Sequence, residues 1–396
     1  MRILLLAPHP FYQERGTPIA VNLLAKALAC RGESVDILTY HEGENLAYDG
    51  DVTIHRIPNQ RFAKNIRPGF SLKKLICDVA MYRKAKQLAH DNSYDCIHAV
   101  EESAFMARRI ARRHKIPYIF DMDSSMPQQI ADKLPIAKPF LPIMRRFEGM
   151  IVRSAAAVVP MCKALADTAQ EMGAKHIEIL HDISLLPDNY ITCPEKGFRK
   201  NLKLTTPTLL YIGNLEPYQG IDLLLDSFAI ATKDAPSANL VIVGGRDDDI
   251  NFYKSKAEIL KIKNQTHFLG PRPLNHMQDL FNDADILVSP RTQGNNTPMK
   301  IYSYLDAGRA ILATNLPTHT QVMSNNEAEL VEPTAESMAS GMLKLLQNEN
   351  LRINLGEKSK RLAQEHYSNS AFETVVNRIY DYIDCTYLCD NSSIKA

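Results

Sequence analysis

The sequence lacks most of the features that mark specialised classes of protein. Its 46 lysines and arginines are balanced by 45 aspartates and glutamates, which excludes a nucleic-acid binder held by bulk positive charge. No apolar run approaches the roughly 18 residues of a membrane-spanning helix. The apolar stretch in Met1–Pro8 is too short for a signal peptide, and sequence repeats and low-complexity tracts are absent. We therefore expect a cytoplasmic protein, and the 396 residues favour two domains.

Motifs for metals and nicotinamide cofactors are also missing. The seven cysteines are odd in number and scattered, which fits reduced thiols better than a disulfide framework. Cys385 and Cys389 lie close together, but no second Cys/His pair completes a zinc set. The first loop is not G-x-G-x-x-G, and no acidic residue ends the second predicted strand. We expect no metal and no resident cofactor.

The first half of the chain alternates short apolar runs with amphipathic stretches, which is typical of a doubly wound parallel sheet. An apolar spacing from Ala20 to Leu28 predicts a helix that ends near Gly32. A second predicted helix covers Ser103–His114. Predicted strands are Ile3–Ala7, Val35–Tyr40, Val52–Ile57, Cys96–Ala99 and Tyr118–Phe120.

The alternation stops between Pro187 and Thr206 and then restarts. We predict an α/β protein of two Rossmann-like, doubly wound parallel-sheet domains that face each other across a cleft. The predicted boundaries are 1–190 and 200–368, with a C-terminal helical segment, 369–396, that packs back on the first domain. In the second domain we predict strands Leu209–Ile212, Leu240–Val243, His267–Leu269, Asp285–Val288 and Ala310–Thr314, and helices Ile221–Ala231, Leu274–Asn282 and Met299–Ala307.

The loop after the Asp285–Val288 strand is the most informative stretch. Thr297 followed by Pro298 predicts a hydroxyl-capped helix start, whose free N–H groups favour an anion. Lys300 lies in the first turn, where a cation opposes the helix dipole unless an anion binds there. Arg291, Asn295 and Asn296 add donors. We interpret the loop as a phosphate or diphosphate site; the alternative is a capped helix with a surface lysine.

Three other loops carry polar groups at predicted strand ends. Gly213–Gly220 follows one strand, and Arg246 and Arg272 follow two others. Together with Arg291 and Lys300 these arginines form a set of four cations that we expect to converge on one anion; each alone fits a solvated side chain. In the first domain, Gly16 between strand and helix favours close approach of a ligand, or is simply a turn glycine.

Taken in order, these segments resemble the GT-B glycosyltransferases of family 4, also called glycosyl transferases group 1. Three stretches carry the resemblance: Pro8 to Tyr40 with Gly16-Thr-Pro, Leu210–Leu225, and Thr297–Thr314. The family binds a nucleotide-sugar mainly on its C-terminal domain and an acceptor on the N-terminal one. It transfers the sugar with retention of anomeric configuration and without a bound metal.

The resemblance also implies roles for individual residues. The two cations that hold the donor diphosphate in the family correspond here to Asn214 and Gln219. The paired glutamates, which contact the donor sugar and the nucleotide ribose, correspond to Asn295 and Ser303. The family's N-domain histidine falls near Asp123. Because all the replacements are polar, we expect an active transferase, with Arg246, Arg272, Arg291 and Lys300 in place of the lost cations.

Asp123 and Asn295 are the candidate catalytic residues. Asp123 is expected to contact the reacting sugar or the acceptor hydroxyl, or else to cap a helix over 124–130. His98, Glu101 and Glu102 follow or end a predicted strand and are expected to line the acceptor side, although a buried or capping role fits His98 as well.

The stretch Arg56–Lys86 has nine lysines and arginines against one acidic residue. Leu72, Leu75, Ile76 and Val79 follow helical spacing within it, and a second basic run covers Arg108–Lys115. Such helices suit anionic lipid surfaces, but a solvated face explains them too. Our hypothesis is a first domain that docks on the inner face of the membrane and an acceptor that is lipid-linked or a growing polysaccharide.

Two other functions share this architecture. A sugar-nucleotide epimerase needs cleft carboxylates, of which the sequence places few, and a non-catalytic nucleotide-sugar-binding relative needs none. Release of nucleoside diphosphate only when an acceptor is present distinguishes a transferase from both.

Overall fold

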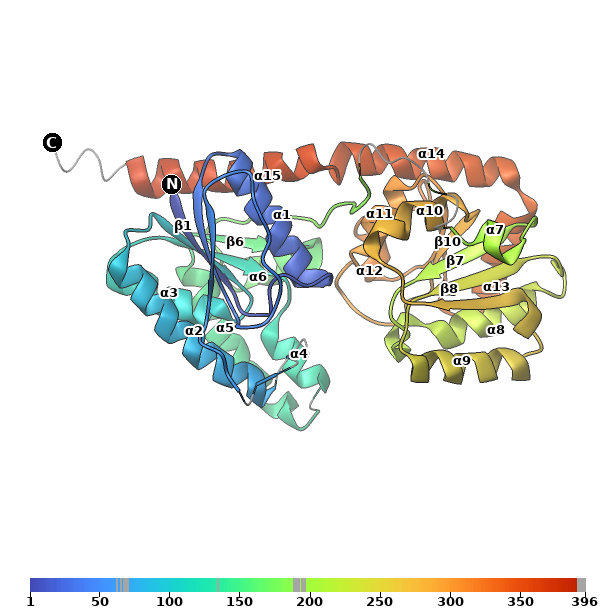
Figure 1. Ribbon diagram of the computed structural model, residues 1–396, viewed down its shortest axis with the longest axis horizontal. Coiled ribbons are helices and arrows are strands. Elements are labelled where there is room, and N and C mark those ends of the chain that lie inside the picture. Colours follow the sequence, from blue (N-terminus) through green and yellow to red (C-terminus); the bar gives the residue numbers. More distant parts are fainter. Residues whose placement is uncertain are drawn as a thin grey trace. The chain divides into compact units, whose positions relative to one another are not determined.

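The computed structural model of the chain (Figure 1) describes residues 1–61, 63–64, 66, 71–133, 135–187, 193 and 197–389. The chain divides into two compact units. Unit 1 comprises Met1–His181 together with the C-terminal segment from Phe372, and unit 2 comprises Asp182–Ala371.

Unit 1 contains a six-stranded sheet in the order β3-β2-β1-β4-β5-β6, in which every neighbouring pair is parallel. The central strands are almost completely buried because helices cover both faces of the sheet, as their unbroken apolar runs predict. The strands are β1 (Arg2–Ala7), β2 (Ser34–Thr39), β3 (Val52–Arg56), β4 (Cys96–Val100), β5 (Tyr118–Met122) and β6 (Ala157–Pro160).

The helices of unit 1 pack their apolar faces on this sheet or on one another. Ser71 caps α2, because its side chain accepts a hydrogen bond from Lys74 N. The helices are α1 (Gly16–Cys30), α2 (Leu72–Asp91), α3 (Ser103–His114), α4 (Met126–Lys133), η1 (Pro135–Phe140), α5 (Leu141–Ser154), α6 (Lys163–Glu171), α15 (Asn369–Ile383), which begins in unit 2, and η5 (Asp384–Leu388). Within the described residues no helix is long and apolar enough to cross a membrane.

Unit 2 repeats the architecture with a parallel sheet in the order β12-β11-β10-β7-β8-β9. Its strands are β7 (Thr208–Ile212), β8 (Asn239–Val243), β9 (Thr266–Gly270), β10 (Ile286–Ser289), β11 (Ala310–Thr314) and β12 (Glu329–Val331). Its helices are α7 (Arg199–Leu202), η2 (Pro217–Gln219), α8 (Ile221–Ala231), α9 (Asp247–Ile259), η3 (Lys263–Gln265), η4 (Leu274–His276), α10 (Met277–Asn282), α11 (Lys300–Asp306), α12 (Pro317–Thr320), α13 (Ala335–Gln347) and α14 (Glu349–His366).

Both sheets have the Rossmann strand order, which confirms the doubly wound parallel sheets predicted from the sequence. In this order the chain reverses direction across the sheet between β1 and β4 in unit 1 and between β7 and β10 in unit 2. Ligands of open α/β sheets bind outside the carboxyl ends of the strands at such a reversal. The fold therefore selects the loops after β1, β4, β7 and β10 as the places to look for a site.

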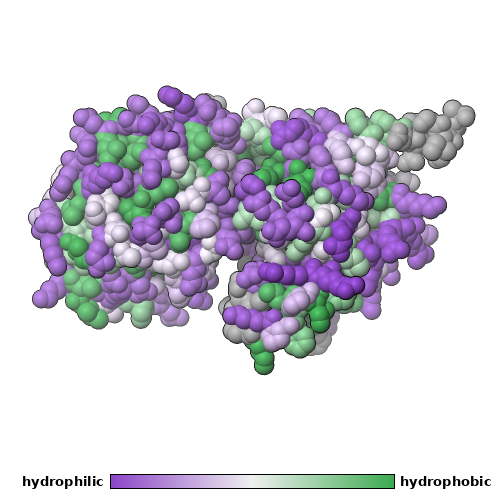
Figure 2. Space-filling model, turned by 180° about the vertical axis from the view of Figure 1, so that it is seen from behind, coloured by the Kyte–Doolittle hydropathy of each residue, from purple (hydrophilic) through white to green (hydrophobic). Residues whose placement is uncertain are grey.

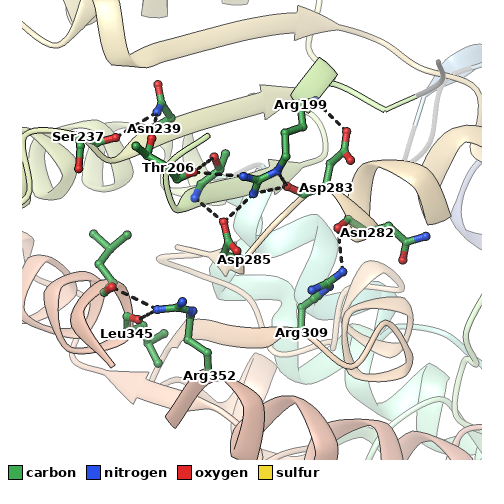
Figure 3. Close-up of polar contacts among 12 residues, drawn as sticks. Arg199, Thr206, Ser237, Asn239, Asn282, Asp283, Asp285, Arg309, Leu345 and Arg352 are labelled. Carbon is green, nitrogen blue, oxygen red and sulfur yellow. Dashed lines mark hydrogen bonds and ion pairs between the residues drawn. The ribbon is translucent and has the colours of Figure 1, made fainter. Parts of the chain in front are cut away.

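Paired polar groups lie at the amino-terminal ends of the strands β7, β10 and β11 of unit 2 (Figure 3). Arg199 forms an ion pair with Asp285 at 2.7 Å and donates to the Asp283 carbonyl at 2.8 Å. Asp285 also accepts from Thr208 N at 2.8 Å. Arg309 donates to the Asn282 carbonyl at 2.8 Å. Each of these two guanidinium groups thus has a carboxylate or a carbonyl as partner.

Helix α15 is anchored on unit 1 by a buried hydrogen-bonded histidine. His98 on β4 has no exposed surface, and the Tyr380 hydroxyl lies 2.9 Å from its Nδ1. Its Nε2 lies 3.2 Å from Asp121. A carboxylate only accepts hydrogen bonds, so Nε2–H donates to Asp121 and Nδ1 accepts from Tyr380. At the rim of the same contact, Arg31 pairs with Asp381 at 2.5 Å.

We expect Tyr380→Phe to lower the free energy of unfolding by about 1–3 kcal/mol, because it leaves the buried Nδ1 of His98 without a partner. Tyr382→Phe is the matched control, since Tyr382 is only half-buried and stacks on His176 through its ring. Urea denaturation measures both, and equal midpoints for the two variants would contradict the role assigned to this contact.

Candidate functional site

The loops after β7 and β10 in unit 2 contact each other at the reversal of the strand order. Thr292 N donates to the Tyr218 carbonyl at 3.0 Å. Gly220 has φ +75°, and a Cβ there would lie 1.9 Å from the Pro290 carbonyl oxygen. Only glycine allows this close approach. The two loops, 213–220 and 290–299, therefore form one continuous structure.

Lys300 reaches from the first residue of α11 back to the end of β7. Its Nζ donates to the Ile212 carbonyl at 3.0 Å and lies 4.0 Å from the centre of the Tyr211 ring. Burial and the neighbouring Arg291 lower the pKa of Lys300 to about 7. The lysine is therefore only partly protonated at neutral pH while no anion lies beside it.

Arg291 lies on loop 290–299, and hydrogen bonds fix one of its terminal nitrogens, Nη1. Its Nη1 donates to the Asn296 carbonyl at 3.0 Å and to Thr318 Oγ1 at 3.2 Å. The guanidinium carbon lies 5.1 Å from the centre of the Tyr218 ring. Burial lowers the pKa of Arg291 without removing its charge. The arginine is thus a fixed cation beside the titrating Lys300.

A buried histidine holds the loop that carries Arg291. His319 Nδ1 lies 2.8 Å from the Thr314 carbonyl and its Nε2 lies 2.8 Å from Ser289 Oγ. Burial, together with the charges of Lys300 and Arg291, lowers the pKa of His319 to about 4. The neutral ring therefore donates through Nδ1 and accepts from Ser289. Thr314 Oγ1 completes the chain by donating to the Arg291 carbonyl at 2.6 Å.

The two cations differ in their partners from Arg199, which lies at the amino-terminal ends of the strands. Within the described part of the chain, no carboxylate lies at ion-pair distance from Arg291 or Lys300, whereas Arg199 pairs with Asp285 (Figure 3). Three buried polar atoms on the same two loops also have no hydrogen-bond partner among the residues that the structure describes: Gln219 Oε1, Arg291 Nε and Thr297 Oγ1. Unpaired cations and unsatisfied polar atoms in one place suit an anionic ligand that also carries hydroxyl groups.

The other two expected cations are exposed to solvent, unlike this pair. Arg246 is exposed and forms an ion pair with Asp249 at 3.1 Å, at the start of α9. Arg272 is exposed, and its nearest described acceptor is the Pro271 carbonyl at 3.4 Å. The structure therefore places Arg291 beside Lys300 and gives Arg246 a carboxylate partner of its own.

Residues aligned with the family's donor site lie around these loops. Asn214 is exposed, 3.5 Å from the Tyr218 hydroxyl, and Gln219 is buried in η2. Asn295 is exposed, and its carbonyl accepts from Gln321 at 2.7 Å. Ser303 is buried, and its hydroxyl accepts from Leu185 N at 3.1 Å. Asn296 is half-buried, and its carbonyl accepts from Arg291 and Thr318.

The structure corrects the expected helix start at Thr297. Helix α11 begins at Lys300 and has seven residues, and no described side chain caps it. Ile301 N donates to the Pro298 carbonyl at 2.9 Å, a tight i→i+3 turn, so the helix starts two residues after Pro298, the first position that the Thr-Pro signal predicts. The Thr297 hydroxyl is one of the three unsatisfied atoms named above, and the anion site depends on side chains instead of the end of a helix.

A second group of ionisable side chains lies at the end of β4 in unit 1. Lys74 Nζ lies 2.5 Å from Glu102 and 3.8 Å from Glu101, and the lysine is largely buried. Burial and the charge of Glu102 raise the pKa of Glu101 to about 7. The same two causes raise the pKa of Asp78 to about 7, and Tyr40 donates to Asp78 at 2.5 Å. Three carboxyl groups thus share one buried ammonium group.

The remaining predicted residues of unit 1 lie in different environments. His98 is fully buried beneath Tyr380, so the expectation that it lines the acceptor side is corrected. Asp123 is half-buried in the turn that follows β5. Gly16 begins α1, and a Cβ added there would meet no described atom within 4 Å, so a larger side chain would find open space.

Sequence reasoning missed Lys74 and His319. Lys74 belongs to the basic stretch that suggests an outward-facing surface, yet it shares the buried face of α2 with Cys77, Asp78 and Met81, three, four and seven residues on. This spacing was the available signal. His319 lies on α12 and offered none, because its partners Ser289 and Thr314 lie at the ends of two strands, β10 and β11.

Within the described residues, no group of three or more histidine, cysteine, aspartate or glutamate side chains is arranged to hold a metal ion.

Two family models match the chain and together span most of it. Residues 15–181 match the model described as glycosyl transferase 4-like domain, and residues 194–362 match glycosyl transferases group 1. Phosphatidyl-myo-inositol mannosyltransferase of Mycobacterium tuberculosis is 23% identical over 97% of both chains. An uncharacterized glycosyltransferase of Haemophilus influenzae is 28% identical over 48% of this chain and 51% of its own length.

Solved structures of glycosyltransferases share the fold. Anabaena Alr3699/HepE in complex with UDP superposes with a TM-score of 0.76 at 15% identity, covering 96% of this chain and all of the other. WaaG, a glycosyltransferase involved in lipopolysaccharide biosynthesis, gives a TM-score of 0.68 at 15% identity and covers 95% of this chain and 99% of its own. At these identities the likeness concerns the fold.

We expect binding of a nucleoside diphosphate at pH 8 to take up about 0.9 proton, because a lysine with a pKa of about 7 is mostly neutral there and the anion restores its charge. Titration calorimetry in buffers of different ionisation enthalpy measures this uptake. Lys300→Arg should bind with little uptake, and Lys300→Met should bind at least tenfold more weakly.

Lys254→Met, on the exposed surface of α9, is the matched control and should behave as the unaltered chain does. Undiminished proton uptake in Lys300→Arg would show that another group titrates and would remove Lys300 from the site.

Proposed function

Because the chain belongs to the GT-B glycosyltransferases, with a glycosyl transferase 4-like domain followed by a group 1 domain, we propose that it transfers a sugar from a nucleoside-diphosphate sugar to a hydroxyl group, with retention of configuration. The acceptor is a lipid-linked or polysaccharide glycan. The observation that carries this proposal is the cation pair Arg291 and Lys300, which has no carboxylate partner within the described residues, at the strand reversal of unit 2.

The donor diphosphate is assigned to this pair. Arg291 supplies a fixed charge, and Lys300 gains its proton as the anion arrives. Asn214 and Gln219 lie on the neighbouring loop, and their amides suit the phosphate oxygens or the sugar hydroxyls. The fold neighbour HepE is a complex with UDP, which supports a nucleotide-sugar donor. Arg246 and Arg272, both exposed, are assigned at most to the rim of this site.

The transfer step breaks the bond between the anomeric carbon and the diphosphate oxygen. The electron pair leaves with the diphosphate, the acceptor oxygen bonds to the anomeric carbon, and the acceptor proton passes to the leaving diphosphate. Negative charge grows on the leaving group, so cations placed there stabilise the transition state more than the ground state. The loops that carry Arg291 and Lys300 offer no carboxylate at ion-pair distance within the described residues, so none is assigned as covalent nucleophile. Asn295 is assigned to the sugar hydroxyls.

The acceptor is assigned to unit 1, at the ends of β4 and β5. Glu101, Glu102 and Ser124 line a pocket there, and Lys74 neutralises part of the carboxylate charge. Raised pKa values keep some of these carboxyl groups protonated at neutral pH, so they can donate as well as accept hydrogen bonds. Such groups suit sugar or glycerol hydroxyls. Asp123, directly after β5, is assigned to the same side.

Unit 1 also presents an amphipathic surface that suits a membrane. Helix α2 exposes Leu72, Leu75 and Ile76, which are 76%, 50% and 46% exposed. Segment η1–α5 exposes Ile136, Phe140 and Ile143 to a similar or greater degree. Clustered apolar side chains among basic ones favour insertion into an anionic lipid interface. We therefore assign the protein to the inner face of the cytoplasmic membrane, as a peripheral protein.

The proposed reaction predicts that nucleoside diphosphate is released only when both a donor and an acceptor are present. A thermal-shift screen with UDP, GDP and ADP first identifies the base, because ligand at 100-fold its dissociation constant stabilises by about 2.7 kcal/mol. Release of the matching diphosphate is then measured with membrane lipid extract as acceptor. Proton NMR of the product reports the anomeric configuration, and an inverted product would refute retention.

Lys300→Met should lower the release rate at least 100-fold while the Lys254→Met control retains it. Release at the same rate without acceptor would indicate an epimerase or a hydrolase. Binding without any release would indicate a non-catalytic relative.

Membrane docking predicts that the protein floats with vesicles of phosphatidylglycerol and phosphatidylcholine at low salt and dissociates at about 0.5 M salt or without the anionic lipid, as Debye screening requires. Leu75→Ser with Ile76→Ser should reduce the bound fraction at least fivefold. Phe252→Ser with Ile259→Ser is the matched control, because these apolar residues on α9 of unit 2 are even more exposed than Leu75 and Ile76. Equal flotation of both double variants would refute docking through α2.

A further inference from the structure

Unit 1 contains an apolar groove to which no role has been assigned above. Helices α2, α3 and α5 enclose it, and its volume is about 490 Å³, within the range of about 300–1,000 Å³ that is usual for small-molecule sites. Its apolar lining includes Val79, Tyr82, Phe105, Met106, Phe147 and Met150. Apolar grooves that are open to the surface are typical binding sites for a ligand or a partner.

The exposed apolar residues of the two neighbouring helices lead into this groove. On α2, Leu72, Leu75, Ile76 and Val79 follow the spacing of one helical face, and Val79 lines the groove. On η1–α5, Phe140, Ile143 and Phe147 follow the same spacing, and Phe147 lines the opposite side. Val79 is 48% and Phe147 is 55% exposed. The groove is thus the inner end of the surface assigned above to the membrane.

The charge around the groove selects an anionic occupant. Four basic side chains line it, Arg83, Lys86, Arg108 and Arg109, against the carboxyl group of Asp78. Asp78 accepts a hydrogen bond from Tyr40, and burial raises its pKa, which reduces its negative charge. Figure 2 shows hydrophobic residues between hydrophilic ones along the lower edge of unit 1. An apolar floor with a basic rim matches a hydrocarbon chain that carries a negative headgroup.

The groove also adjoins the acceptor pocket. Phe105 and Ile151 line both the groove and the smaller pocket that contains Glu101, Glu102 and Ser124. A chain seated in the groove would therefore place its headgroup beside the carboxylates at the end of β4.

We propose that the groove between α2, α3 and α5 binds one acyl chain of an anionic acceptor lipid and so presents the lipid headgroup to the pocket at the end of β4. That the bound lipid is the acceptor rests on the proposed function. That the groove binds an anionic single-chain lipid does not depend on the proposed function. The occupant is a lipid molecule drawn out of the bilayer surface, and the guanidinium groups at the rim contact its phosphate.

The test measures lipid binding in solution, without vesicles. Dansylundecanoic acid, a fluorescent single-chain carboxylate, is titrated into the full-length protein below its critical micelle concentration. Lysophosphatidylglycerol, lysophosphatidylcholine and glycerol 3-phosphate then compete with it. We expect lysophosphatidylglycerol to displace the probe at least tenfold more effectively than lysophosphatidylcholine, and glycerol 3-phosphate to have no effect.

Two kinds of variant locate the binding. Val79→Ser with Phe147→Ser changes only half-exposed residues, so folding is retained, and it should weaken probe binding at least tenfold. Met150→Trp fills the groove and should do the same. Ile353→Trp, on an exposed position of α14, is the matched control and should bind as the unaltered protein does. Arg83→Gln with Arg109→Gln should remove the preference for lysophosphatidylglycerol.

Equal probe binding by Val79→Ser/Phe147→Ser and the unaltered protein would overturn the inference. Competition by glycerol 3-phosphate would show a headgroup site without a chain, and displacement only by an acidic amphipathic peptide would show a protein partner; either result refutes it. Groove-dependent probe binding in a protein that shows no acceptor-dependent diphosphate release would refute the proposed transferase alone. Normal transfer with groove-independent probe binding would refute the groove alone.

Discussion

The candidate site of unit 2 is built around two cations, Arg291 and Lys300, that lie together with no counterion among the described residues. Burying Lys300 and placing it beside Arg291 costs free energy, and the lowered pKa of Lys300 expresses this cost. A shift of this size corresponds to several kcal/mol. A stable sheet does not require two cations without a counterion. At the amino-terminal ends of the same strands, Arg199 is paired with Asp285. The two charges are therefore best understood as half of an interaction that a ligand completes.

Neutral hydrogen-bonded groups keep these cations in place. His319 is uncharged, so it fixes the Arg291 loop through Ser289 and Thr314 without adding a third positive charge. Tyr304 adds no charge either, and its hydroxyl accepts from Ile212 N while Lys300 holds the Ile212 carbonyl. A carboxylate in either position would neutralise the pair and compete with an anionic ligand. His319 and Tyr304 thus support Arg291 and Lys300 without reducing the positive potential of the site.

The fold was predictable from the sequence because most buried strands are continuous apolar runs, and β11, α3 and α8 occur at the predicted residues. The four-residue β6 and three-residue β12 were not predicted, although β10, also of four residues, was. The candidate site was predictable only in part. Lys300 and Arg291 both lie on one informative loop, but the sequence could not show that Arg246 has its own partner in Asp249. His319 depends on Ser289 and Lys74 on Glu102, each far away in the sequence, and such partners become visible only when the fold is assembled.

Helix α2 shows why charge counting along the chain is insufficient to assign function. Its basic residues have two different roles, since Lys74 faces inward to Glu101 and Glu102 whereas Arg83 and Lys86 face the groove. The inward lysine lowers the electrostatic cost of a carboxylate cluster that suits hydroxyl groups. The outward cations lie beside apolar side chains that suit lipid. One helix therefore joins the polar pocket at the strand ends to the amphipathic surface, and any lipid that binds this surface is held next to the carboxylates by a rigid element instead of a loop.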